Sequence, residues 1–154
     1  MEISLDSIDL QILNLMQNNA RITNVELARQ LEMAPSAVLE RVKKLEQKEV
    51  IRGYTTRIDP VAVQQKLLAF IFIKAADGMG SSETAKCLAT IPEVQEVHHV
   101  AGDDCYLIKI RTADSASLMN IMRSKLSIIP KIVSTRTTIV LETIKEENTI
   151  TIPK

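Results

Sequence analysis

Residues 34–48 form the stretch of this sequence best suited to contact nucleic acid. Val38, Val42 and Leu45 recur with helical spacing and predict a helix with one narrow apolar stripe. The opposite face begins with small residues and continues into charged ones: Ser36, Ala37, Glu40, Lys43 and Lys44. A helix in a DNA groove needs this order, with a slim tip near base edges and cations near phosphates. A solvated face of an ordinary surface helix is the alternative.

A second candidate site is the glycine turn formed by Gly102, Asp103 and Asp104. A glycine turn exposes backbone amides that can hold an α-carboxylate, and an adjacent carboxylate can pair an α-ammonium. The hydroxyls of Thr135 and Thr137 could line the same cavity from a neighbouring subunit. A plain hairpin turn with two solvated aspartates, and a strand selected only for β-propensity, remain the alternatives.

The remaining reactive side chains predict neither a metal site nor a catalytic centre. His98 and His99 are the only histidines, and neighbours on a strand point to opposite faces. Cys87 lies among apolar residues, and Cys105 follows acidic Asp104 instead of the cations that activate a thiol. We therefore predict a protein that is not an enzyme and that needs no cofactor.

Two short helices are predicted before the helix at residues 34–48. An apolar stripe over residues 5–15 predicts the first, with Asp6 as its N-cap. Thr23 and Glu26 form a capping box that begins the second, and a turn of three or four residues leads on to residue 34. This is the helix-turn-helix pattern, and the short second helix favours it over a generic three-helix bundle.

Composition limits the protein to one domain or two small ones, because the chain has 154 residues and a formal net charge of zero. Charge is uneven, however: residues 34–57 hold six cations and three anions, a local excess of +3. We expect no signal peptide from residues 1–6, which lack a charged n-region and an apolar core, and the longest apolar run, residues 67–73, is too short to cross a membrane. Two cysteines without zinc-type spacing predict a reducing cytoplasm.

The rest of the chain predicts a β-α-β-β-α-β unit, the ferredoxin-like arrangement. A β-branched strand at 50–58 and a turn at Asp59-Pro60 mark the boundary before it. The expected strands are 67–75, 94–101, 105–112 and 132–144, with helices after Ser82 and Asp114. One face of such a sheet stays open and apolar, so we expect the chain to associate through it.

Five motifs together resemble the Lrp/AsnC (leucine-responsive/asparagine regulator) family of transcription regulators over nearly the whole chain. They are Leu5-Asp6-Ser7-Ile8-Asp9 with Ile12-Leu13, Asn24-Val25-Glu26-Leu27-Ala28, Leu39-Glu40-Arg41-Val42-Lys43-Lys44-Leu45-Glu46, Val50-Ile51-Arg52-Gly53-Tyr54 and Ile58-Asp59-Pro60. The resemblance implies dimers that pair through the second domain, and often octamers. It also implies an amino-acid sensor at the glycine turn and at contacts between dimers.

Three positions depart from the family pattern. Ala34 stands where the family usually has Ser, which removes a helix N-cap, and Glu49 stands where it usually has Gly at a helix end. Cys105 stands where Asp is frequent, so Asp103 or Asp104 would have to pair the ammonium.

We therefore expect an α+β protein with a winged-helix-like helix-turn-helix domain at 1–50, a strand and hinge at 51–65, and a ferredoxin-like βαββαβ domain at 66–154. The expected DNA contacts are Asn24, Pro35, Ser36, Ala37, Glu40, Arg41, Lys43, Lys44 and Arg52, with Arg41 and Arg52 on phosphates. The expected effector contacts are Ala101, Gly102, Asp103, Asp104, Cys105, Thr135 and Thr137. The predicted function is transcriptional regulation in response to a small amino acid, and the alternative is a ligand-independent, nucleoid-architectural protein that binds double-stranded DNA.

Overall fold

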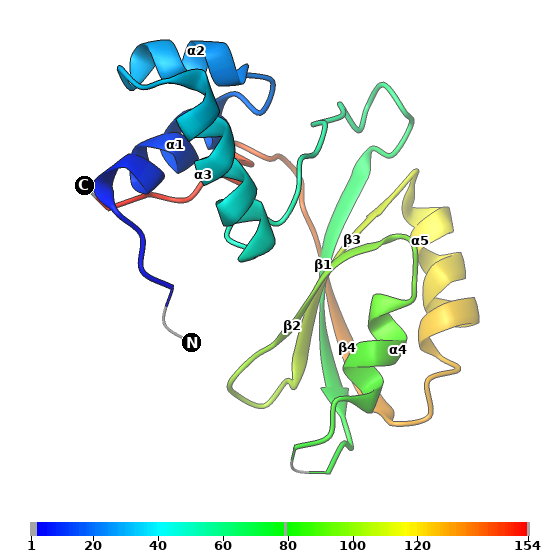
Figure 1. The fold of residues 1–154 in the computed structure, drawn as a ribbon. Coiled ribbons are helices and arrows are strands. Elements are labelled where there is room, and N and C mark those ends of the chain that lie inside the picture. The colour runs from blue at the N-terminus through cyan, green and yellow to red at the C-terminus, as the bar shows by residue number, and fades with distance from the viewer. Residues whose placement is uncertain (1–2, 79, 154) are drawn as a thin grey trace. The chain divides into compact units, whose positions relative to one another are not determined.

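The computed structural model describes residues 3–78 and 80–153 and divides the chain into two compact units (Figure 1). The first unit contains the chain up to Arg57 together with the residues from Lys145 onward. The second unit is Ile58–Ile144. The segment after residue 144, expected to belong to the second domain, therefore groups with the first.

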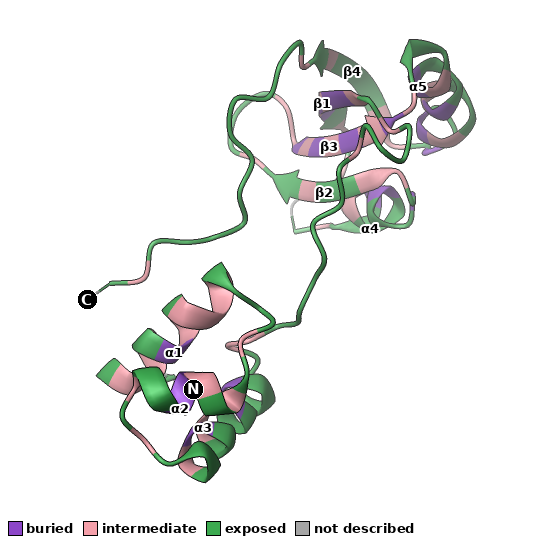
Figure 2. Ribbon diagram, turned by 90° about the horizontal axis from the view of Figure 1, so that it is seen from above, coloured by how far each residue is buried: buried purple, intermediate pink, exposed green. Residues whose placement is uncertain are grey.

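The first unit is built on three helices: α1 (Ser7–Asn18), α2 (Asn24–Gln30) and α3 (Pro35–Gln47). Their apolar stripes meet in one core of Ile12, Leu27, Ala28, Val38, Val42 and Leu45. Figure 2 shows buried stretches on each of the three helices. Burial of the predicted stripe, more than helix propensity, holds such short helices in place.

Caps fix where two of these helices begin. The Asp6 carboxylate accepts a hydrogen bond from the Asp9 amide, and the Asp9 carboxylate accepts one from the Asp6 amide. Together they form a complete capping box on α1. Thr23 accepts from the Glu26 amide as predicted. The prediction that the Glu26 carboxylate binds back to the Thr23 amide is wrong, because this carboxylate instead accepts from Arg29 and Gln30.

The second unit confirms the predicted βαββαβ order. Its elements are β1 (Leu67–Ala75), α4 (Glu83–Ala89), β2 (Val94–His99), β3 (Tyr106–Thr112), α5 (Ser115–Ile121), a π-helical turn (Met122–Leu126) and β4 (Ile132–Ile139). The strands form one antiparallel sheet in the order β2-β3-β1-β4. Both helices cover the same face of this sheet (Figure 1).

Alternation along β1 and β3 decides which side chains the helices cover. Ile71 and Ile73 lie beside Ile108 and Tyr106 across the strand pair, and all four are buried in the core. Phe70, Phe72 and Leu107 point to the other face and are half-buried. Within the described residues, no element of this unit covers that second face.

Three strand predictions need correction. Residues 50–58 form no strand in the described chain: residues 50 and 51 bend back toward the end of α3, and residues 52–58 have no regular structure. β-propensity does not by itself provide the ladder that makes a strand. The strand predicted at 94–101 ends at His99, where the turn to β3 begins. The strand predicted at 132–144 ends at Ile139, where its ladder with β1 ends at the pair of Ile139 with Ala69.

Candidate functional site

The exposed face of α3 is the first candidate site. The predicted stripe of Val38, Val42 and Leu45 is buried, which turns the opposite face outward. That face presents Ser36, Glu40, Lys43 and Lys44 to solvent, whereas Ala37 is half-buried. Pro35 begins the helix, and Ala34 provides no side-chain cap, as its residue type predicts.

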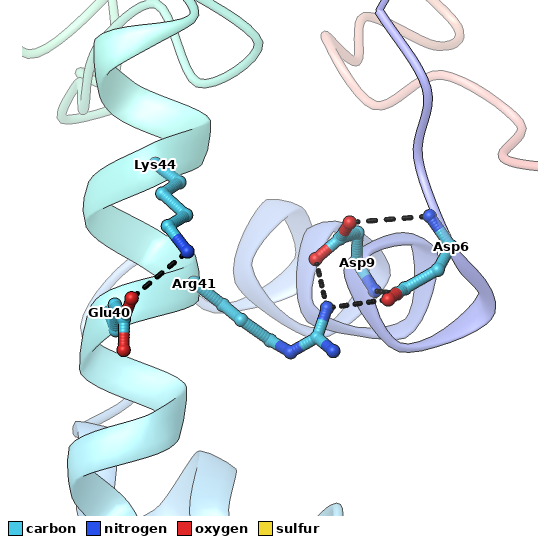
Figure 3. A network of polar contacts seen from close by, with 5 residues as sticks. All are labelled: Asp6, Asp9, Glu40, Arg41 and Lys44. Atoms are coloured by element: carbon cyan, nitrogen blue, oxygen red, sulfur yellow. Dashed lines mark hydrogen bonds and ion pairs between the residues drawn. The ribbon is translucent and has the colours of Figure 1, made fainter.

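Arg41 does not lie on this face with a free guanidinium. Its Nη1 atom donates to Asp6 at 2.7 Å and to Asp9 at 2.8 Å, joining α3 to the capping box of α1 (Figure 3). The Asp9 side chain is 17% exposed and the Arg41 side chain 30%. The Asp9 amide and then the guanidinium lower the pKa of Asp6, and bonds to Asp6 and Asp9 raise the pKa of Arg41. Arg41 therefore positions α3 through a charge-compensated contact.

The cations on α3 and just after it differ in their partners. Lys44 forms an exposed i,i+4 ion pair with Glu40 at 2.9 Å, and this lysine lowers the pKa of Glu40 (Figure 3). Lys43 and Arg52 are exposed and have no ion-pair partner within residues 3–78 and 80–153. These two cations, like the exposed Lys48 at the end of α3, are therefore available to a phosphate. Asn24, the first residue of α2, is half-buried.

The turns on either side of α3 each contain a glutamate with a positive φ, a backbone conformation that favours glycine. Glu32 has φ +53° between α2 and α3, and Glu49 has φ +55° after α3. At the second turn the Val50 amide donates to the Leu45 carbonyl at 2.9 Å, and the Glu49 amide donates to that of Glu46, also at 2.9 Å. This is a Schellman closure with glutamate at the left-handed position. The sequence signalled Glu49 only through its departure from the family glycine, and nothing signalled Glu32.

The glycine turn between β2 and β3 is the second candidate site. Gly102 has φ +121°, a conformation that L side chains rarely adopt, so the turn requires glycine. Ala101, Gly102 and Asp103 are exposed, whereas Asp104 and Cys105 are half-buried. The Cys105 thiol donates to the Ala75 carbonyl at 3.4 Å.

Asp104 already has a cationic partner in the chain. Arg136 of β4 donates from Nη2 to Asp104 Oδ2 at 2.9 Å, and its guanidinium carbon lies 4.3 Å from the centre of the Phe72 ring. Arg136 lies between Thr135 and Thr137 in the sequence, and its residue type alone did not predict this ion pair. Its neighbours Thr135 and Thr137 pair across the strands with Ile73 and Ile71, so they lie on the face that the helices cover. The described chain thus brings Arg136 to Asp104, and leaves the threonines on the opposite face of the sheet.

The two histidines point apart, as strand neighbours should. His98 Nε2 lies 3.1 Å from Glu96, and the His99 ring packs against Tyr106 with centroids 5.2 Å apart. Among the described residues, no group of three or more His, Cys, Asp or Glu side chains could hold a metal ion. No helix in the described part of the chain is both long and apolar enough to cross a membrane.

Comparison with known proteins covers both units. Residues 5–52 match the family described as winged helix-turn-helix DNA-binding, and residues 68–150 match the Lrp/AsnC ligand binding domain. The leucine-responsive regulatory protein of Escherichia coli is 37% identical over 152 residues, which cover 96% of this chain and 92% of that protein.

Solved structures agree with this comparison. A transcriptional regulator of Neisseria meningitidis in complex with L-Met has a TM-score of 0.88 at 28% identity, over 96% of this chain and 97% of that one. A feast or famine regulatory protein of M. tuberculosis, complexed with L-methionine, has a TM-score of 0.89 at 32% identity, over 97% of this chain and all of that one. The predicted resemblance and fold class are confirmed.

Proposed function

Because the chain belongs to the Lrp/AsnC family of transcriptional regulators, we propose that it contacts double-stranded DNA through α3 and that a small amino acid bound at the glycine turn alters its assembly or its DNA affinity. The observation that carries the DNA contact is the buried stripe of α3, which leaves Ser36, Glu40 and Lys43 facing outward. We place this function in the cytoplasm, where Cys87 and Cys105 remain free thiols.

A salt series tests the DNA contacts. Each phosphate contact releases counterions, so Lys43→Ala and Arg52→Ala should each reduce the slope of log affinity against log salt by about one. Lys86→Ala on α4, which removes a cation from the second unit, is the matched control and should leave the slope unchanged. Wild-type slopes in both test variants would refute this placement of α3.

The effector is proposed to be a zwitterion that uses the amides around Gly102 and the carboxylate of Asp103 or Asp104. Asp104 keeps acceptor capacity, because a carboxylate offers about four lone-pair sites and Arg136 occupies one of them. The two structural relatives described with methionine make this the first amino acid to test. The contributions of Thr135 and Thr137 are proposed to come from a neighbouring subunit.

A melting screen against all amino acids tests the effector. A ligand that binds the folded state should raise the melting temperature by mass action, and Asp104→Ala should abolish that rise while DNA binding without ligand persists. A rise that survives in Asp104→Ala would place the site elsewhere. If millimolar amino acids change neither melting, assembly nor DNA affinity, the ligand-independent architectural function replaces the sensor.

Self-association is proposed to occur through the uncovered face of the sheet, first as homodimers and then as octamers. The half-buried Phe70, Phe72 and Leu107 give this face an apolar centre that a second copy can cover. A fragment that starts near Val61 should sediment as a dimer or larger, as should the full chain. A stable monomer at micromolar concentration would contradict the proposal.

A further inference from the structure

The residues that follow β4 are bound to the surface of α1. Gln17 of α1 donates from Nε2 to the Ile150 carbonyl at 2.9 Å, and its Oε1 accepts from the Ile150 amide at 3.1 Å. One side-chain amide thus satisfies both backbone groups of Ile150, as a neighbouring strand would. In Figure 1 the red trace of this segment, residues 145–153, runs beside α1 within the first unit.

Further polar contacts hold the same segment, which we call the trailing segment. Arg57 donates from Nη2 to the Glu146 carbonyl at 2.7 Å. Gln17 Nε2 also donates to Asn14 Oδ1 at 3.4 Å, a long contact that orients the carboxamide. A shallow polar groove of about 420 Å³ lies between α1 and the segment. Ile150 is 73% exposed, so apolar burial contributes little and hydrogen bonds define the register.

The docked segment gives the first unit a second covalent connection to the sheet. One connection runs from α3 through residues 48–66 to β1, and the other runs from β4 through residues 140–144 to the trailing segment. Five residues span at most about 18 Å when fully extended. If β4 moves farther from the first unit than residues 140–144 can extend, the chain must therefore displace the trailing segment. Because Gln17 binds that segment, α1 is displaced with it.

We propose that α1 is a docking surface for the trailing segment, and that the docked segment carries a change in β4 to the DNA-binding unit. The second half of this statement rests on the proposed function, because it needs an effector that acts near β4. A ligand shifts DNA affinity only if its binding free energy differs between two arrangements of the protein. The docked and released segments are two such arrangements, because a released segment no longer constrains α1, and only residues 48–66 then connect α3 directly to the sheet.

Amide hydrogen exchange, followed by NMR on the full chain, tests the docking. Gln17→Ala removes the acceptor of the Ile150 amide, so that amide should exchange about tenfold faster, which corresponds to about 1.4 kcal/mol. Gln17→Glu keeps an acceptor oxygen and should leave this amide protected, although it loses the donor to the carbonyl. Gln11→Ala on the same helix is the matched control, because the Gln11 side chain is exposed. Equal Ile150 exchange in wild type and Gln17→Ala overturns the docking.

DNA affinity with and without the amino acid that most raises the melting temperature tests the transmission. Gln17→Ala should keep the ligand-induced rise in melting temperature and the DNA affinity without ligand, yet lose at least half of the ligand-induced change in log affinity. Gln11→Ala should respond as wild type does. A full response in Gln17→Ala overturns the transmission even if its Ile150 amide exchanges faster. If wild type itself responds to no amino acid, the sensing function and the transmission both fail, and the Ile150 exchange alone decides the docking.

Discussion

Arg41 on α3 and Asp9 on α1 form a 2.8 Å ion pair, which connects the helix proposed to enter DNA to the first turn of α1. Because this guanidinium is engaged by carboxylates, Arg41→Ala should weaken DNA binding without changing its salt slope. The melting temperature should fall, since Asp6 and Asp9 lose their cation. Binding isotherms over a salt series and thermal melts measure both effects.

A matched pair of variants separates positioning from phosphate contact. Lys43→Ala should show the opposite pattern, with a lower slope and an almost unchanged melting temperature, because Lys43 is exposed. Asp9→Asn should resemble Arg41→Ala, since it weakens the same ion pair from the other helix. If Arg41→Ala instead reduces the slope by about one while Asp9→Asn binds normally, Arg41 contacts phosphate directly and its pairing with α1 does not position α3.

Glu49 provides a test of backbone strain at the end of α3. A left-handed residue with a side chain costs about 1 kcal/mol more than glycine, and Glu49 adopts φ +55°. Glu49→Gly should therefore raise the melting temperature of the first unit by several degrees. Glu49→Ala removes the charge but keeps Cβ, and a gain in that variant equal to the glycine gain would assign the effect to charge.

Gly102 and Gly78 differ in conformation although both are surrounded by open space. A Cβ added at either position would meet no atom within 4 Å, but only Gly102 has a positive φ, +121°. Gly102→Ala should therefore reduce the free energy of unfolding by about 1–3 kcal/mol through backbone strain alone, and the melting temperature should fall with it. Gly78→Ala should be nearly neutral. Similar losses in both variants would show that the conformation at residue 102 is not responsible.

Acid should destabilise the second unit through Asp77. This carboxylate accepts from Tyr106 at 2.6 Å and from Thr84 at 2.8 Å, and the Tyr106 bond is the main cause of its lowered pKa. A carboxylate with a lowered pKa in the folded state contributes stability that is present above its ordinary pKa of 3.8 and is lost as pH falls through the folded value. The melting temperature should therefore drop as pH falls below the ordinary pKa of 3.8, and this drop should be smaller in Asp77→Asn.

Tyr106 gives the complementary result in base. The Asp77 bond raises the pKa of Tyr106 to about 12 from 10.0, so its contribution is present below pH 10 and is lost as pH rises toward 12. Tyr106→Phe should melt with a flatter pH dependence than wild type over this range. An equally steep decline in Tyr106→Phe would mean that other groups, such as Tyr54, dominate the alkaline loss.

The sequence by itself determined the elements whose signal is local. Helical spacing of Val38, Val42 and Leu45 located α3 and its outward face, and alternation along 105–112 located the buried side of β3. Capping chemistry located the starts of α1 and α2. These features depend on neighbours within a few residues, so their pattern is written along the chain.

Only the tertiary structure decided which distant groups meet. It joined Arg41 to Asp9, Arg136 to Asp104 and Gln17 to Ile150, over sequence separations of 32, 32 and 133 residues. It also left residues 50–58 without a ladder, because a strand requires a partner and no residue type can guarantee one. Ion pairs and docked segments form where packing brings two surfaces together, and the spacing of residues along the chain does not predict which surfaces meet.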